Sequence, residues 1–123
     1  MDYTPFVEGF AVILAPKYIM YMFSGVFFGL ILGALPGLTG TLGIALMLPF
    51  TYSMSPLTAL VFLLSIYSGG LFGGAITAIM INTPGSPANI ATMLDGYPMM
   101  KKGMASEALG LALTSSVIGG IIG

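Results

Sequence analysis

The sequence "INTPGSPAN", from Ile81 to Asn89, interrupts a long apolar stretch and decides how the segments around it can be arranged. It contains two prolines, one glycine and four side chains that carry an amide or a hydroxyl. Proline has no N–H donor and glycine weakens a helix, so a continuous helix through this stretch is not expected. We predict a break between helices here, with a new short helix that opens at Ser86 and Pro87.

The composition around this break is that of a membrane protein. Of the 123 residues, 57% are hydrophobic and 6% are charged, whereas a soluble domain has about 25% charged residues. No charged residue lies between Tyr18 and Leu94, which is long enough for several membrane crossings. The net charge of −1 favours no nucleic-acid partner. The sequence has no cysteine or histidine and no nucleophile with a recognisable base, so we expect neither an enzyme nor an organic cofactor.

Four apolar segments are predicted to form helices. Pro5–Ala15 is expected to lie at the membrane interface, and Tyr18–Leu35 is the first candidate crossing, about 27 Å long as a helix. Leu57–Ile81 is the second candidate, and Met104–Ile122 is the last. We interpret the whole chain, residues 1–123, as a single membrane domain, divided into an interfacial segment (1–17) and a transmembrane part (18–123).

Glycines at four-residue spacing mark the first two crossings. Small residues at this spacing let two helix backbones approach closely, which drives association where lipid offers no hydrophobic force between helices. The predicted packing glycines are Gly25, Gly29, Gly33, Gly69, Gly70, Gly73 and Gly74.

A second break is predicted at "LPGLTG", from Leu35 to Gly40. The apolar piece that follows, Thr41–Leu48, would be only about 12 Å long as a helix, roughly half of the hydrocarbon core. It is therefore predicted to be a half-helix or re-entrant element. The alternative for either break is an ordinary solvent-exposed turn between two crossings.

Breaks of this kind are informative about function. Irregular backbone is tolerated at membrane depth only where it is buried in protein or lines a cavity, and paired broken helices are typical of transporter sites. Free N–H groups and neutral side-chain donors suit an anion, while carbonyls released by an unwound helix can coordinate Na⁺, the only metal ion we expect. The candidate substrate- or ion-binding residues are Pro36, Gly37, Thr39, Gly40, Thr41, Asn82, Thr83, Pro84, Gly85, Ser86 and Asn89.

The region after the second break is more polar. A short apolar run, Ile90–Leu94, precedes "DGYPMMKKG", which we predict to be a polar loop from Asp95 to Gly103. Because Gly96 and Pro98 follow it, Asp95 is interpreted as a loop or cap residue. Lys101 and Lys102 predict that this loop faces the cytoplasm.

Two long blocks of sequence resemble a known family. They are "GALPGLTGTLGIALMLPFTY" (Gly33–Tyr52) and "YSGGLFGGAITAIMINTPGSPANIATMLDGYPMMKKGMASEALG" (Tyr67–Gly110). Their order and motifs are similar to the large membrane subunit of the tripartite tricarboxylate transporters, the TctA type. The resemblance extends over nearly the whole chain from about Gly25 onward.

The resemblance implies an all-α integral membrane protein with broken, re-entrant half-helices at its Pro-Gly motifs, forming the first part of an inverted-repeat transporter fold. It also implies a secondary permease for tricarboxylates or other carboxylates in the bacterial inner membrane, driven by Na⁺ or H⁺. Its partners would be a small TctB-like membrane subunit and a periplasmic TctC-like solute-binding protein. Family members are much longer, so we expect an N-terminal fragment. The alternative is a truncated or small non-transporting membrane protein with a role in assembly or helix packing.

Overall fold

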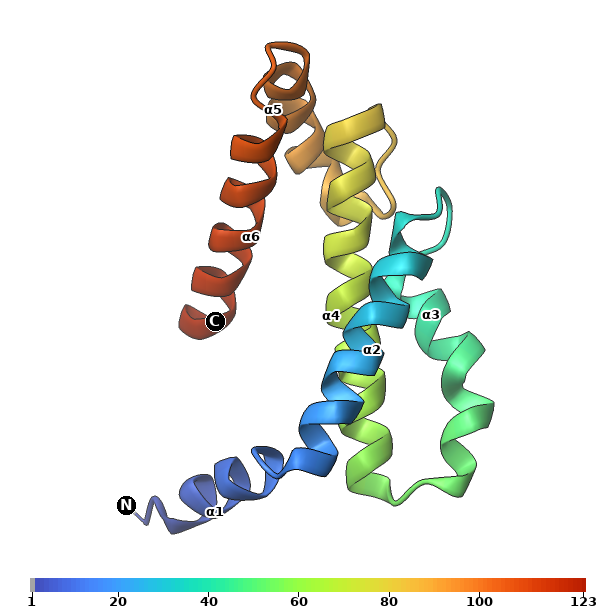
Figure 1. Cartoon of the computed structure of the whole chain (residues 1–123), viewed down its shortest axis with the longest axis vertical. Coiled ribbons are helices and arrows are strands. Elements are labelled where there is room, and N and C mark those ends of the chain that lie inside the picture. The colour runs from blue at the N-terminus through green and yellow to red at the C-terminus, as the bar shows by residue number, and fades with distance from the viewer. Residues whose placement is uncertain (1) are drawn as a thin grey trace.

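The computed structural model describes residues 2–123, in which every regular element is a helix. Figure 1 shows two long helices side by side, a third long helix that descends from the top of the molecule, and shorter helical segments that connect them or precede them. The elements are α1 (Thr4–Ile13), α2 (Pro16–Ala34), α3 (Gly40–Met47), η1 (Leu48–Ser53), α4 (Pro56–Ile81), η2 (Pro87–Asn89), α5 (Ile90–Lys101) and α6 (Ala105–Ile122).

Three of these helices are long and apolar enough to cross a membrane: α2, α4 and α6. They coincide with the three predicted crossings, and α4 is the longest, at 26 residues. The prediction of an all-α integral membrane protein is confirmed. Helix α1 lies across the end of the molecule where α2 begins (Figure 1), and its placement at the membrane interface stays a prediction.

Helix α4 is central and packs along α2 through glycine. Gly25 contacts the backbone at Phe62, and Gly33 contacts Gly70, which is eight residues further along each helix. The two helices therefore run parallel to each other. All seven glycines predicted to mediate packing are buried. A methyl group at Gly29 would overlap the Ile66 carbonyl and lie 2.9 Å from the Gly70 nitrogen. The backbones of α2 and α4 are therefore in direct contact along their glycine faces, as small residues at this spacing allow.

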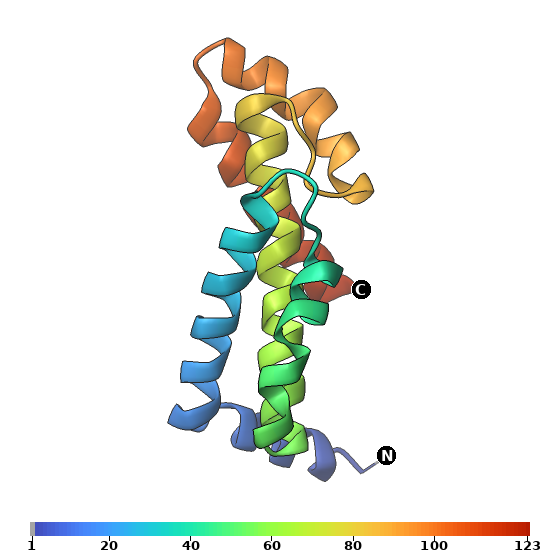
Figure 2. The ribbon, with the colours of Figure 1, turned by 90° about the vertical axis from the view of Figure 1, so that its right-hand side faces the viewer.

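The eight-residue helix α3 returns along the same side of α4. It begins where the Thr39 hydroxyl accepts a hydrogen bond from the Leu42 N–H at 3.2 Å, which caps the helix. Gly43 packs against side-chain atoms of Ile66 and Leu32. The 3₁₀ helix η1 then continues to the start of α4, so α2, α3 and η1 form a hairpin (Figure 2). The predicted half-helix is confirmed, one residue earlier than expected.

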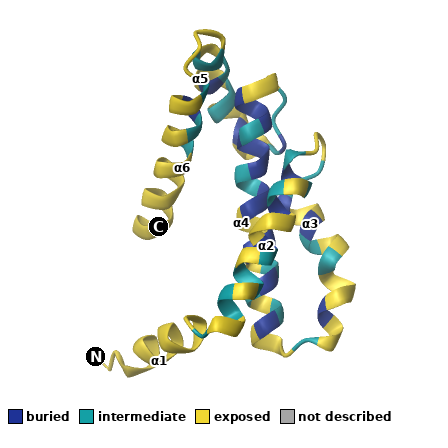
Figure 3. Cartoon of the chain, in the orientation of Figure 1, coloured by how far each residue is buried: buried dark blue, intermediate teal, exposed yellow. Residues whose placement is uncertain are grey.

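The burial pattern is that of a protein whose outer surface meets an apolar medium. Figure 3 shows that buried residues gather along α4, where Ile66, Ala78 and Ile79 are inaccessible to solvent. The large side chains of α2 point outward instead; Phe23 is 74% exposed and Phe27 is 62% exposed. Glycine faces inward and phenylalanine outward because close packing, and not the burial of large apolar side chains, holds helices together in lipid.

The predicted polar loop from Asp95 to Gly103 is wrong. Helix α5 continues through Asp95, Gly96 and Pro98 and ends at Lys101. Tertiary packing explains the difference: a methyl group at Gly96 would lie 2.6 Å from the Ile79 Cγ1, so this glycine lets α5 lie directly on α4. Contacts of this kind commonly override a local preference for a turn. Asp95 is consequently an exposed helix residue, not a loop or cap residue.

Candidate functional site

The first break is a tight turn between α2 and α3. The Leu38 N–H donates to the Leu35 carbonyl at 3.0 Å, and Gly37 adopts a left-handed conformation with φ of 88°. A side chain at that φ would be strained, which explains the glycine. Because α2 and α4 start at the same end of the molecule, the turn lies beside the middle of α4, well before the end of that helix (Figure 2).

The second break folds the chain back along α4. Asn82 ends the helix in a left-handed conformation, with φ of 56°, and the Thr83 N–H donates to the Thr77 carbonyl at 3.3 Å. Asparagine is one of the few non-glycine residues that tolerate this conformation. The chain then descends until the Gly85 N–H lies 3.5 Å from the Gly74 carbonyl. Gly74 is seven residues before the end of α4, or about 10 Å along its axis.

The structure brings the two breaks together at a cluster of glycines whose backbones are in direct contact. A methyl group at Gly70 would lie 2.6 Å from the Gly40 Cα, at the end of the first break. A methyl group at Gly85, in the second break, would lie 2.6 Å from the Gly74 Cα and 2.8 Å from the Gly33 carbonyl oxygen. We call these residues the glycine cluster; its members are Gly33, Gly40, Gly70, Gly74 and Gly85. The close approach that Gly85 permits is thus to the protein's own backbone.

The predicted site residues differ in their exposure. Pro36, Gly37, Thr41 and Asn82 are exposed; Thr39, Thr83, Pro84 and Ser86 are half-buried; Gly40, Gly85 and Asn89 are buried. Of the exposed members, Pro36 and Gly37 lie in the first turn, Thr41 lies in the first turn of α3 and Asn82 lies at the end of α4; the buried members lie against α4.

Several of the polar groups hold the backbone in place. The Ser86 residue precedes η2, as predicted for the opening of a new helix, but its side chain does not cap the backbone. Its hydroxyl instead accepts a hydrogen bond from Asn89 Nδ2 at 3.2 Å. The Thr83 hydroxyl donates to the Ile81 carbonyl at 3.2 Å. The two breaks are therefore stabilised by neutral hydrogen bonds, and neither contains a charged residue.

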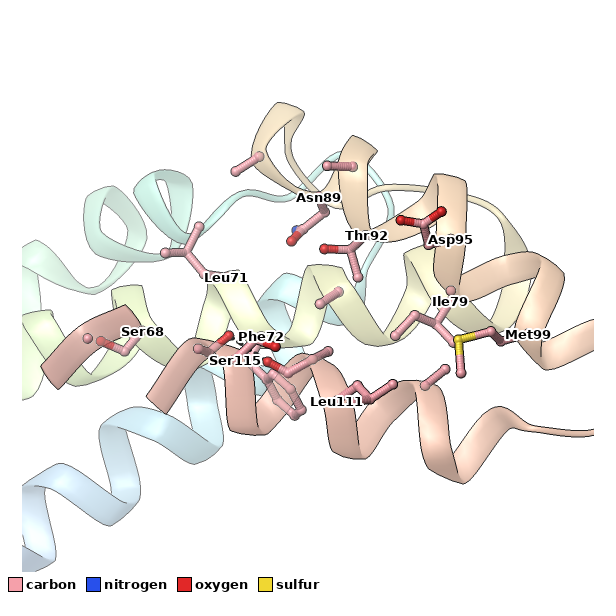
Figure 4. A pocket seen from close by; sticks show the side chains of 18 residues that line it. Ser68, Leu71, Phe72, Ile79, Asn89, Thr92, Asp95, Met99, Leu111 and Ser115 are labelled. Atoms are coloured by element: carbon pink, nitrogen blue, oxygen red, sulfur yellow. Dashed lines mark hydrogen bonds between the residues drawn. The ribbon is translucent and has the colours of Figure 1, made fainter. Parts of the chain in front are cut away.

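A cavity of about 760 Å³ lies between α4, α5 and α6, and sequence reasoning did not predict it (Figure 4). Asn89 is the predicted site residue that reaches it, with 6% of its surface exposed. Thr92 and Asp95 follow along the same wall. The three-residue spacing of Asn89, Thr92 and Asp95 would have predicted a shared helix face. That signal was missed because Gly96 and Pro98 indicated a loop.

Lysines lie away from the breaks, near the ends of helices. The Lys101 Nζ lies 4.9 Å from the centre of the Tyr97 ring, at the end of α5, and the Lys17 Nζ lies 5.7 Å from the centre of the Tyr18 ring, at the start of α2. Both arrangements are cation–π contacts. These ends of the molecule are opposite one another in Figure 1. Any anion bound at the breaks would therefore rely on backbone N–H groups and neutral side chains.

Comparison with known proteins identifies relatives over most of the chain. Residues 19–123 match the model of the tripartite tricarboxylate transporter TctA family. An uncharacterized 52.8 kDa protein from Agrobacterium vitis, in the TAR-I ttuC′ 3′ region, is 43% identical over 114 residues. That match covers 93% of this chain but 23% of the relative, so the chain spans about a quarter of the relative's length. No solved structure matches the chain.

Proposed function

Because the chain belongs to the tripartite tricarboxylate transporter TctA family, we propose that it forms part of a membrane permease that takes up tricarboxylates or related carboxylates. The permease acts as an ion-coupled secondary carrier in the bacterial inner membrane, with several crossings and no enzymatic activity. The observation that carries this proposal is the convergence of two Pro-Gly breaks at the glycine cluster beside α4.

The carboxylate is held at the two breaks by neutral groups. The proposed ligands are the predicted residues of the first break, from Pro36 to Thr41, and of the second break, from Asn82 to Asn89. Backbone N–H groups and hydroxyl or amide donors bind an anion without a fixed positive charge. A buried lysine or arginine would bind more tightly but would be costly to desolvate. Neutral donors suit a carrier, which must also release its substrate.

The glycine cluster supports this proposal in mechanical terms. The first break contacts Gly70 at Gly40, and the second break contacts Gly74 at Gly85. Because Gly70 and Gly74 are neighbours on α4, a movement of one turn is transmitted to the other through this helix. A carrier needs such a linkage because its site must open to each side of the membrane in turn.

Family membership supports the energy source and the partners that we propose. Uptake is driven by a gradient of Na⁺ or H⁺. A small TctB-like membrane subunit and a periplasmic TctC-like solute-binding protein complete the system, and the binding protein delivers the carboxylate to the permease.

The experiment is uptake of labelled carboxylates by proteoliposomes that contain the complete permease, with its partner proteins and an imposed ion gradient. Ser86→Ala is expected to weaken apparent substrate affinity by about 1–2 kcal/mol, or roughly 5- to 30-fold in KM, through loss of one donor. Ser106→Ala is the matched control, because this exposed serine lies at the start of α6, away from both breaks. Wild-type protein that takes up no labelled carboxylate under any gradient would show that the proposed function is wrong. Equal KM values for the two variants would place the substrate site elsewhere.

A further inference from the structure

The cavity between α4, α5 and α6 has one polar wall. Asn89, Thr92 and Asp95 follow one another at three-residue intervals, so their side chains lie on the same side of η2 and α5. Figure 4 shows them along one edge of the cavity, with Ser68 of α4 and Ser115 of α6 across from them. We call Asn89, Thr92 and Asp95 the polar row. It runs from the level of Gly74, deep along α4, to the level of Ile79 near its end.

The oxygens of the polar row have no partners within the part of the chain that the structure describes. Neither the Asp95 carboxylate nor the Thr92 hydroxyl makes a hydrogen bond or ion pair among residues 2–123. Asn89 is nine-tenths buried, and its Nδ2 donates to Ser86, which leaves its carbonyl oxygen without a donor. Asp95 is exposed, and no fully buried side-chain oxygen or nitrogen among residues 2–123 lacks a hydrogen-bond partner, so these oxygens are open to the cavity and can accept a ligand.

The charge of the cavity decides which ligand it attracts. Asp95 is the one charged residue that lines it, and the nearest lysine on the same helix, Lys101, lies over the Tyr97 ring. A carboxylate substrate would be repelled by Asp95, whereas a cation would be attracted. No group of three acidic or histidine side chains occurs within residues 2–123, so the charge favours a monovalent ion over a divalent one.

We propose that this cavity binds the coupling cation as Na⁺, with the Asp95 carboxylate as charged ligand and the Thr92 hydroxyl as neutral ligand. This inference rests on the proposed function of the permease. Oxygen ligands of this kind suit a hard cation such as Na⁺. Asn89 forms the inner end of the polar row, and its side chain bonds Ser86 in the second break. A cation in the cavity therefore acts on the same segment that holds the substrate, and by linkage the effect of Na⁺ on substrate affinity equals the effect of the substrate on Na⁺ affinity.

Two measurements test the cation site in the complete permease. The first is carboxylate uptake by proteoliposomes as a function of Na⁺ concentration. Asp95→Asn is expected to raise the Na⁺ concentration for half-maximal uptake by about tenfold or more, because the charged ligand is lost. Thr92→Val is expected to raise it by a few-fold. The matched control is Glu107→Gln, which removes a carboxylate that lies in the first turn of α6 and does not line the cavity.

The second measurement is binding of radioactive Na⁺ to the purified permease without substrate, which does not depend on transport. Wild-type protein and Glu107→Gln should bind Na⁺, and Asp95→Asn should bind it at least about tenfold more weakly. Uptake with an unchanged Na⁺ dependence in Asp95→Asn would overturn the cation site while leaving the carrier function intact. Uptake that follows a proton gradient and is indifferent to Na⁺ would overturn it as well. Loss of Na⁺ binding in Asp95→Asn alone would support the site even if no transported carboxylate were found.

Discussion

Replacement of Gly29 by alanine tests whether α2 and α4 are held together by direct backbone contact. The added methyl group would overlap the Ile66 carbonyl and lie 2.9 Å from the Gly70 nitrogen. Non-bonded heavy atoms rest at about 3.5–4.0 Å, so the helices would have to separate by about 1 Å at this point. The obstacle is backbone on α4, not the end of a flexible side chain, and it cannot move aside. Overpacking of this kind costs about 1–3 kcal/mol.

The matched control is Gly110→Ala in α6. Apart from its chain neighbours and the adjacent backbone of its own helix, no atom among residues 2–123 lies within 4 Å of the position that its methyl group would occupy. Both substitutions gain the same helix propensity, about 1 kcal/mol in alanine's favour, so this contribution cancels in the comparison. The remaining difference reports the contact between α2 and α4.

The assay is reversible unfolding of the complete protein in mixed micelles with increasing sodium dodecyl sulfate. We expect the free energy of unfolding of Gly29→Ala to be lower than that of Gly110→Ala by about 1–3 kcal/mol. Values that agree within about 0.5 kcal/mol would refute the packing argument, because the helices would then have room for a side chain at their closest point.

Two further predictions concern the end of α4 and the orientation of the chain. Asn82→Gly should keep the stability of the wild type, whereas Asn82→Val should lower the free energy of unfolding by about 1–3 kcal/mol, because valine is strained at a φ of 56°. Thermal unfolding in detergent measures this difference, and equal stabilities of the two variants would mean that the turn relaxes freely. A cysteine that replaces Lys102 should react with an impermeant thiol reagent only after the cells are opened, because loops rich in lysine face the cytoplasm; labelling of intact cells would reverse the orientation.

The sequence alone determined the approximate bounds of the three long helices and of α3. Apolar stretches of membrane-spanning length predicted α2, α4 and α6, because the hydrocarbon core sets both the length and the polarity of a crossing. Proline and glycine located both breaks, since neither residue supports a continuous helix. The short interval between Gly40 and Pro49 predicted the length of α3. The spacing of Gly25, Gly29 and Gly33 predicted a packing face, because small residues four apart lie on one side of a helix.

Only the tertiary structure decided which surfaces meet. A glycine face shows that a helix packs closely but not which partner it chooses or in which direction, so the parallel register of α2 and α4 was not predictable. The convergence of the two breaks depends on that register. Helix α5 was missed because contact between Gly96 and Ile79 outweighs the local turn preference of its sequence. The polar row and its cavity exist because α5 is helical and lies against α4, and this packing places the Asp95 carboxylate in the cavity that Asn89, the partner of Ser86, also lines.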